Sequence, residues 1–238
     1  MLRENESELV TSSDTIAVFQ TMLRNAHTIV DLSVLISTDM PIYPGDPNPL
    51  IEPLSTIKEG GANTTRIILG AHTGTHVDVP YHLLARGKTV DELPLETFRG
   101  SAVTYDLTHK ALGSRVSPDD LKKAISLKNG EIALFYTGSN VPATSGSTSR
   151  PYTSLDITMA DWLIEKQAKA AGIDSMSVDP LHSPKNEVHK KLLQNGIVIF
   201  ENLSDNLRLL TRQRVLFFGA PLRLKRADAS PIRAFALI

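Results

Sequence analysis

Residues 72–82 read His72-Thr73-Gly74-Thr75-His76-Val77-Asp78-Val79-Pro80-Tyr81-His82 and hold three of the seven histidines of this 238-residue chain. In an extended strand alternate side chains share a face, so the histidines and the aspartate at even positions would all project to one side. A helix would turn Asp78 about 200° away from His76, and Pro80 would interrupt it. The stretch therefore predicts a strand that gathers imidazoles and a carboxylate on one face.

Imidazole nitrogens and carboxylate oxygens are ligands of divalent metal ions. His72, His76 and Asp78 are therefore candidate ligands of one ion, and His82 lies further along the same face. The competing interpretation is a solvated strand with scattered polar residues. The valines between these positions supply an apolar opposite face, and Gly74 suits a close approach of the backbone to a site, so we favour the metal site.

The composition is that of one globular domain, with 41% hydrophobic and 21% charged residues. A net charge of −1 without a long block of like charge argues against nucleic acid or an anionic membrane as partner. The absence of cysteine excludes disulfides, thiolate ligands and a cysteine nucleophile. Residues 1–8 lack the features of a secretory signal and no apolar run reaches membrane length, so we expect a cytoplasmic protein.

The chain is expected to consist of an N-terminal extension, residues 1–26, and a domain over residues 27–238. Apolar residues at helical spacing predict a short amphipathic helix over 14–25. Its apolar stripe could pack on the domain's own core or on another subunit.

Within the domain, short strands are predicted to alternate with helices. We expect strands near 30–34, 64–69, 103–107, 132–136, 175–178 and 197–200. We expect helices from Ser117-Pro118 to about 129–130, over 157–170 with an end at Gly172, and over 187–194 before Asn195-Gly196. Turn-rich loops are expected around 41–47 and 141–153. This order indicates an α/β fold with the site at the edge of its sheet.

Two distant residues are candidates to complete the metal site. Glu201 follows the apolar run of residues 197–200, and a charge at the end of a buried strand must be paired or metal-bound. His189 lies just upstream on a predicted helix. A capping glutamate and a surface histidine are the alternatives. His182, in the loop after Asp179, could face a substrate, whereas His27 and His109 are interpreted as structural.

The run from His72 to His82 resembles the signature of the metal-dependent cyclase family, which includes the bacterial kynurenine formamidases and isatin hydrolases. The resemblance extends from about Val30 to the C-terminus. Four weaker segments fall in the family's order: Asp31-Leu32-Ser33, Tyr43-Pro44-Gly45-Asp46, Leu93-Pro94-Leu95-Glu96 and Ser230-Pro231-Ile232-Arg233.

This resemblance implies a fold of the swivelling β/β/α type, assembly into a homodimer or homotetramer, and two zinc or manganese ions in each subunit. It implies that His72, His76 and Asp78 hold one ion and that Asp78 bridges to a second. His189 and Glu201 would complete the second set of ligands. His82 would correspond to the catalytic acid/base.

The activity implied by the resemblance is a metal-dependent hydrolase that cleaves an amide, formamide or cyclic amide of a small molecule through metal-activated water. The sequence departs from the family at one point: Ser139-Asn140 follows Thr137-Gly138, where many formamidase-like members carry a tryptophan. Whether the substrate carries an aryl group is therefore left undecided. The alternatives are a hydrolase of lactones or esters, a binding protein without activity, and a serine hydrolase using Ser139 or Ser145. No Gly-x-Ser-x-Gly motif supports the last of these.

Overall fold

The computed structural model describes residues 28–122, 124–140, 151–181 and 183–238. The predicted helix over 14–25, most of the predicted loop over 141–153, and His27 and His182 lie outside the described residues.

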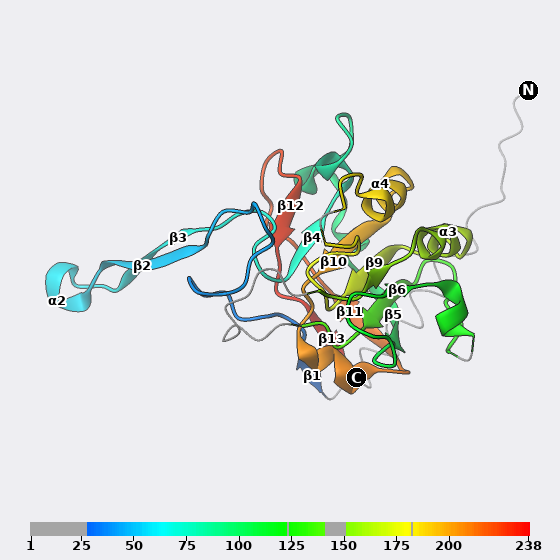
Figure 1. The fold of residues 1–238 in the computed structure, drawn as a ribbon. Coiled ribbons are helices and arrows are strands. Elements are labelled where there is room, and N and C mark those ends of the chain that lie inside the picture. Colours follow the sequence, from blue (N-terminus) through cyan, green and yellow to red (C-terminus); the bar gives the residue numbers. More distant parts are fainter. Residues whose placement is uncertain (1–27, 123, 141–150, 182) are drawn as a thin grey trace, which may run out of the picture.

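A nine-stranded sheet forms the centre of the described chain (Figure 1). The strands follow in the spatial order β1-β13-β11-β5-β7-β9-β10-β4-β12. Their bounds are β1 Ile29–Asp31, β4 His76–Asp78, β5 Arg99–Asp106, β7 Ile132–Tyr136, β9 Ala170–Ile173, β10 Val198–Glu201, β11 Arg214–Phe218, β12 Ala229–Pro231 and β13 Phe235–Leu237. Strands β5, β7, β9 and β10 run parallel, and β4 pairs antiparallel with β10.

The two faces of this sheet carry separate hydrophobic clusters because successive side chains of a strand point to opposite sides. In β7, Leu134 belongs to one cluster and Phe135 to the other, and every residue of the strand is buried. Helices α3 (Ile157–Glu165) and α4 (Glu187–Gln194) cover the Phe135 face. The cluster on the Leu134 face also contains residues of the 3₁₀ helix η6 (Asp205–Leu210) and of strands β1 and β13. Burial on both faces explains the continuous apolar sequence of β7.

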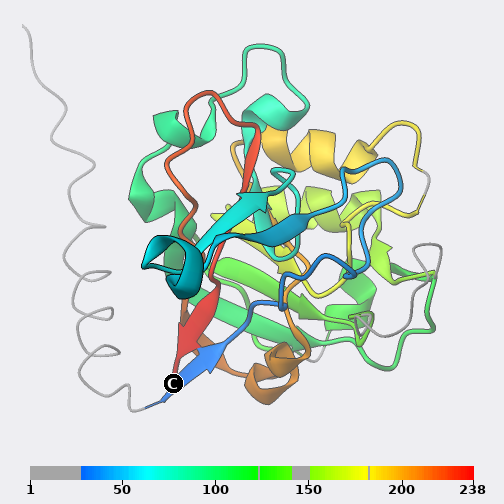
Figure 2. The same ribbon diagram turned by 90° about the vertical axis from the view of Figure 1, so that its left-hand side faces the viewer.

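A β-hairpin extends away from the central sheet (Figures 1 and 2). It consists of β2 (Leu50–Ser55) and β3 (Thr64–Ile68), with the short helix α2 (Ile57–Gly60) at its tip. The remaining pair is β6 (Arg115–Val116) with β8 (Ser154–Leu155). Further 3₁₀ helices are η1 Pro80–His82, η2 Val90–Glu92, η3 Leu95–Phe98 and η4 Pro118–Leu121.

The helix predicted from Ser117 to about 129–130 is wrong beyond its first turn. The start is formed as expected, since Ser117 N–H donates to the Asp120 carboxylate, but only η4 follows. The backbone after it bonds elsewhere: Arg214 donates to the Ser126 carbonyl, and Lys128 N–H donates to Glu131. This long-range bond from Arg214 and the local bond to Glu131 replace the hydrogen bonds four residues apart that a longer helix needs.

The helix predicted over 157–170 ends at Glu165. Gln167 takes a left-handed conformation with φ of 52°, and Ala170–Ile173 forms β9. The strand predicted over 175–178 is therefore wrong, because the sheet uses the four residues before Asp174 instead. A Cβ on Gly172 would lie 2.6 Å from Leu134 Cδ2, so β9 needs small residues to pack in the sheet interior.

The α/β class and the single domain predicted from sequence are confirmed by this architecture. The strand over 132–136 and the helix over 187–194 have the predicted bounds. Among the described residues, no helix is long and apolar enough to cross a membrane.

Candidate metal centre

Strand β4 places His76 and Asp78 on the sheet face that α4 covers. Val77 lies opposite Phe200 in the neighbouring strand, and both belong to the hydrophobic cluster on the opposite face of the sheet, which also contains Leu134. The predicted alternation of polar and apolar side chains between the two faces is thus present in β4. The same register sets Glu201 opposite His76 at the end of β10. Pairing of two short strands therefore brings residues 125 positions apart in sequence to one point.

His72 and His82 do not lie on this strand, so the single extended strand predicted over 72–82 is wrong. His72 belongs to a turn before β4, in which Gly74 has a φ of +67° and a Cβ there would lie 3.0 Å from Ile36 Cγ1. His82 ends η1, which begins at Pro80. The chain therefore bends on both sides of β4 and brings the two imidazoles together, with the His72 and His82 ring centroids 4.5 Å apart.

The first set of donor atoms surrounds Oδ1 of Asp78. Nδ1 of His72 lies 2.9 Å from this oxygen and Nε2 of His76 lies 3.4 Å from it. Nδ1 of His76 bonds the Gly74 carbonyl at 2.9 Å, which directs its Nε2 into the cluster. Ligand atoms about 2.0 to 2.2 Å from a shared ion lie roughly 3 to 3.5 Å apart, so this set has the spacing of a metal site.

The second set surrounds the other oxygen of Asp78. Nε2 of His189, on α4, lies 3.2 Å from Asp78 Oδ2 and 3.1 Å from Glu201 Oε1. The His189 ring is fixed from behind, because its Nδ1 bonds Asp179 Oδ2 at 2.7 Å. Each set of three residues could hold one metal ion, and Asp78 belongs to both.

Among the described residues, three buried atoms of these sets make no hydrogen bond of good geometry, although imidazoles lie close to the two carboxylate oxygens: His76 Nε2, Asp78 Oδ1 and Asp78 Oδ2. A buried carboxylate without well-formed hydrogen bonds is costly, and coordination of a cation is one way to offset that cost. The donors are nitrogen and oxygen atoms, which zinc and manganese accept. The residues present therefore fit a divalent metal centre.

The charged groups of the cluster shift one another's pKa values. Burial alone would lower the pKa of His72, but the Asp78 and Asp228 carboxylates outweigh it and raise that pKa to about 10. Burial would raise the pKa of Glu201, yet His189 lowers it to about 2. The neighbouring histidines likewise hold the pKa of Asp78 well below its usual range against the effect of burial. The acids are thus ionised at neutral pH and present negative charge to a cation.

The cluster opens onto a cavity of about 200 Å³. All six residues singled out from the sequence line it, together with residues of the predicted turn-rich loop at 41–47: His72, His76, Asp78, His82, His189, Glu201, Pro41, Tyr43, Asp46 and Pro47. His109 lies apart from it on the surface, 3.8 Å from Asp120.

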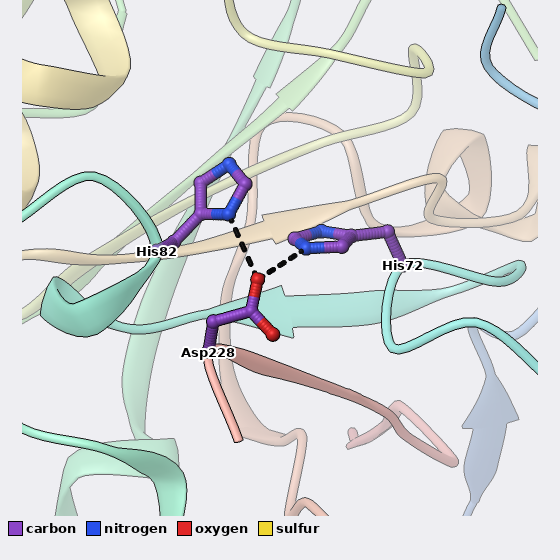
Figure 3. A group of neighbouring side chains, drawn as sticks. All are labelled: His72, His82 and Asp228. Atoms are coloured by element: carbon purple, nitrogen blue, oxygen red, sulfur yellow. Dashed lines mark hydrogen bonds and ion pairs between the residues drawn. The ribbon is translucent and has the colours of Figure 1, made fainter. Parts of the chain in front are cut away.

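Sequence reasoning missed Asp228. Its Oδ2 lies 3.0 Å from His72 Nε2 and 3.1 Å from His82 Nδ1 (Figure 3). The only signal was its place two residues before the Ser230-Pro231 segment. The contact between Asp179 and His189 was not predicted from the sequence either.

Ser139 shows no sign of being a nucleophile. It is buried, and its hydroxyl bonds Thr137 Oγ1 and Thr153 N–H. No histidine is among its partners in the described part of the chain, and Ser145 lies outside that part.

Comparisons with known proteins identify the family of this chain. The family model described as "Putative cyclase" matches residues 30–180. Kynurenine formamidase from Bacillus thuringiensis (strain Al Hakam) is 32% identical over 208 residues, which cover 86% of this chain and 95% of that protein.

Solved structures share the fold. A protein from Bacillus stearothermophilus described as a "predicted metal-dependent hydrolase" is 27% identical, with a TM-score of 0.73 over 88% of this chain and 98% of its own. Isatin hydrolase A from Ralstonia solanacearum aligns with a TM-score of 0.81 over 99% of this chain and 100% of its own, at 20% identity. By sequence match and by architecture, this chain belongs to the cyclase family that the signature at residues 72–82 predicted.

Proposed function

We propose that this protein is a metal-dependent hydrolase that cleaves the C–N bond of a formamide, amide or cyclic amide. The observation that carries the proposal is the shared position of Asp78, whose two oxygens each face a separate set of imidazole and carboxylate donors. Such an arrangement suits two divalent ions, zinc or manganese, bridged by one carboxylate.

His72, His76 and Asp78 would hold one ion, and Asp78, His189 and Glu201 the other. Ions bound there would acidify water so that it attacks at neutral pH, and would polarise the scissile carbonyl. The chain's own contribution is to keep the donors buried and oriented. The hydrogen bonds behind His76 and His189 do this by fixing which ring nitrogen faces inward.

His82 is the proposed acid/base. Its ring lines the cavity beside both donor sets, with the His189 ring centroid 5.9 Å away, yet it belongs to neither set. It would take a proton from the attacking water and return it to the leaving nitrogen as the C–N bond breaks. General acid/base catalysis of this kind contributes a factor of about 10² to 10⁴.

The substrate class follows from the relatives. One sequence relative is a kynurenine formamidase and one structural neighbour is an isatin hydrolase, so a formamide and a cyclic amide are the first candidates. The cavity of about 200 Å³ suits a small molecule. Lactone and ester hydrolysis stay as alternatives, because the same chemistry attacks those carbonyls.

We also propose a domain organisation, a cellular location and an oligomeric state. Residues 1–26 form an extension to a catalytic domain over 27–238, and the chain works in the cytoplasm as a homodimer or homotetramer. The family resemblance supports this assembly, and light scattering after gel filtration tests it.

The decisive experiment measures turnover of N-formylkynurenine, isatin, a lactone and an ester by metal-free protein reloaded with zinc or manganese. We expect hydrolysis that depends on added metal, for the formamide or the cyclic amide. Full activity after exhaustive chelation would contradict the proposal and favour a serine hydrolase. Tight metal binding without turnover of any substrate would favour a binding protein.

A further inference from the structure

One carboxylate oxygen joins two imidazoles with different assignments. Oδ2 of Asp228 lies 3.0 Å from Nε2 of His72, a metal-ligand candidate, and 3.1 Å from Nδ1 of His82, the acid/base candidate (Figure 3). The two rings are tilted by 52° to one another, so they approach the same oxygen from different directions.

Backbone hydrogen bonds fix the main chain of Asp228 beside β4. Asp228 immediately precedes β12, which pairs with β4 so that Ala229 lies opposite Asp78. Val79 N–H also donates to the Asp228 carbonyl at 3.1 Å. The strand that carries His76 and Asp78 therefore also positions the backbone of Asp228.

An ionised carboxylate only accepts hydrogen bonds, so each ring nitrogen that bonds Asp228 carries the proton. In neutral His72 this leaves the Nδ1 lone pair on the side of Asp78, 2.9 Å from its Oδ1. In neutral His82 it leaves Nε2 as the basic atom, which is the nitrogen that points away from Asp228 (Figure 3). One contact thus selects a tautomer for both rings.

We propose that Asp228 is a positioning residue that orients a metal ligand and the acid/base together, so that metal binding and proton transfer depend on one side chain. This inference rests on the proposed function for its catalytic half only. A carboxylate behind a ligand imidazole raises the ligand's basicity and fixes its ring, and loss of such a partner costs about 10- to 100-fold in metal affinity or activity.

The competing assignment makes Asp228 a ligand, because His72, His82 and Asp228 also have the spacing of a metal site. The contacts argue against it. Asp228 is 39% exposed at its side chain, and it faces the ring nitrogen of His72 remote from the buried Asp78. The donor sets around Asp78 are far more buried.

The test compares Asp228→Asn with Asp91→Ala. Asparagine keeps the shape but can present an amide donor to a ring, which favours the other tautomer. Asp91 accepts a hydrogen bond from Arg226 N–H at 2.9 Å, so its loss loosens the same loop without touching either imidazole. Metal affinity is measured by competition with a chelator, metal content at saturation by elemental analysis, and ring tautomers by ¹H–¹⁵N spectra of ¹⁵N-histidine in the zinc-loaded protein.

For Asp228→Asn we expect unchanged metal content at saturation, metal affinity lower by about 10-fold or more, and a mixture of His82 tautomers in place of the Nδ1–H form. We also expect kcat to fall by at least about 10-fold with KM within about 2-fold. Asp91→Ala should match the wild type in all four measurements.

Three results would overturn the inference. Loss of one ion at saturation would make Asp228 a ligand. Equal effects of both variants would show that Asp228 only stabilises the loop. Unchanged tautomers with unchanged metal affinity would show that Asp228 does not position the two rings. The affinity and tautomer measurements need no substrate, so they decide the inference even if the proposed hydrolysis fails.

Discussion

Nδ1 of His189 bonds Oδ2 of Asp179 at 2.7 Å, and the same carboxylate accepts the backbone N–H groups of Val188 and His189 at the start of α4. One aspartate thus anchors the first turn of the helix and turns its histidine toward Asp78. The orientation of His189 in the second donor set therefore depends on this carboxylate.

Asp179→Asn should therefore weaken the second donor set more than the first. We expect one ion to dissociate about 10- to 100-fold more readily than in the wild type, measured by metal content after dialysis against a weak chelator. Asp161→Asn is the matched control, since Asp161 contacts α4 at Lys191 on the outer surface. Equal metal retention by the two variants would contradict this prediction.

Asp78→Ala should remove both ions, because its two oxygens serve both donor sets. His72→Ala and Glu201→Ala should each leave one ion, since each belongs to one set. Elemental analysis of purified protein, with unfolding curves to show that each variant is folded, measures the difference. Full metal occupancy in Asp78→Ala would exclude the bridging role.

His82→Ala should keep its metal and lose activity. We expect kcat to fall by about 10² to 10⁴, the usual contribution of general acid/base catalysis, with metal content unchanged. His109→Ala is the control, because that histidine is 55% exposed and distant from the cavity lining. If His82→Ala also loses metal, His82 is a ligand and not the acid/base.

Gly87→Ala should displace the turn that carries His82. A Cβ at Gly87 would lie 2.3 Å from the carbonyl carbon of Pro80, the first residue of η1. We expect the variant to lose about 1 to 3 kcal/mol of stability, as overpacking costs, together with activity. Urea unfolding and kcat measure both effects, and the exposed neighbour Arg86→Ala should change neither. A Gly87→Ala protein with normal kcat would show that the turn tolerates displacement.

Glu131→Gln should reveal a pH-dependent contribution to stability. Burial raises the pKa of Glu131, but hydrogen bonds from Arg214, Lys128 N–H and Ser101 outweigh it and hold that pKa below its ordinary value of 4.5. A folded-state pKa below the unfolded one stabilises the protein above about pH 4.5, and this stabilisation is lost as the pH falls through the folded pKa.

We accordingly expect Glu131→Gln to cost about 1 to 3 kcal/mol at pH 7, with a difference from the wild type that narrows below pH 4.5. Urea unfolding from pH 3 to 8 measures it. The exposed Glu165→Gln should stay within about 0.5 kcal/mol of the wild type throughout. A difference that is constant with pH would show that packing, and not charge, accounts for the cost.

Elements with strong local signals were predictable. The apolar run 132–136 and the periodic segment 187–194 have the predicted bounds, because their burial patterns match a strand and a one-sided helix. Prediction failed where partners distant in sequence compete for the backbone. Ala170 and Ala171 favour a helix by propensity, yet they lie in the sheet because β7 and β10 offer them hydrogen bonds on both sides.

By itself, the sequence determined the family, the α/β class and the pairing of His76 with Asp78 on one face, since alternation along a strand is a local property. Glu201 was a candidate from sequence, but only the tertiary structure decided how His72 and His82 turn back beside this pair and that Asp228 meets both of them. Strand register brings Glu201 opposite His76, and the β12–β4 pairing brings Asp228 against both outer imidazoles. Contacts across more than a hundred residues depend on register and turn geometry, which no local pattern of side chains encodes.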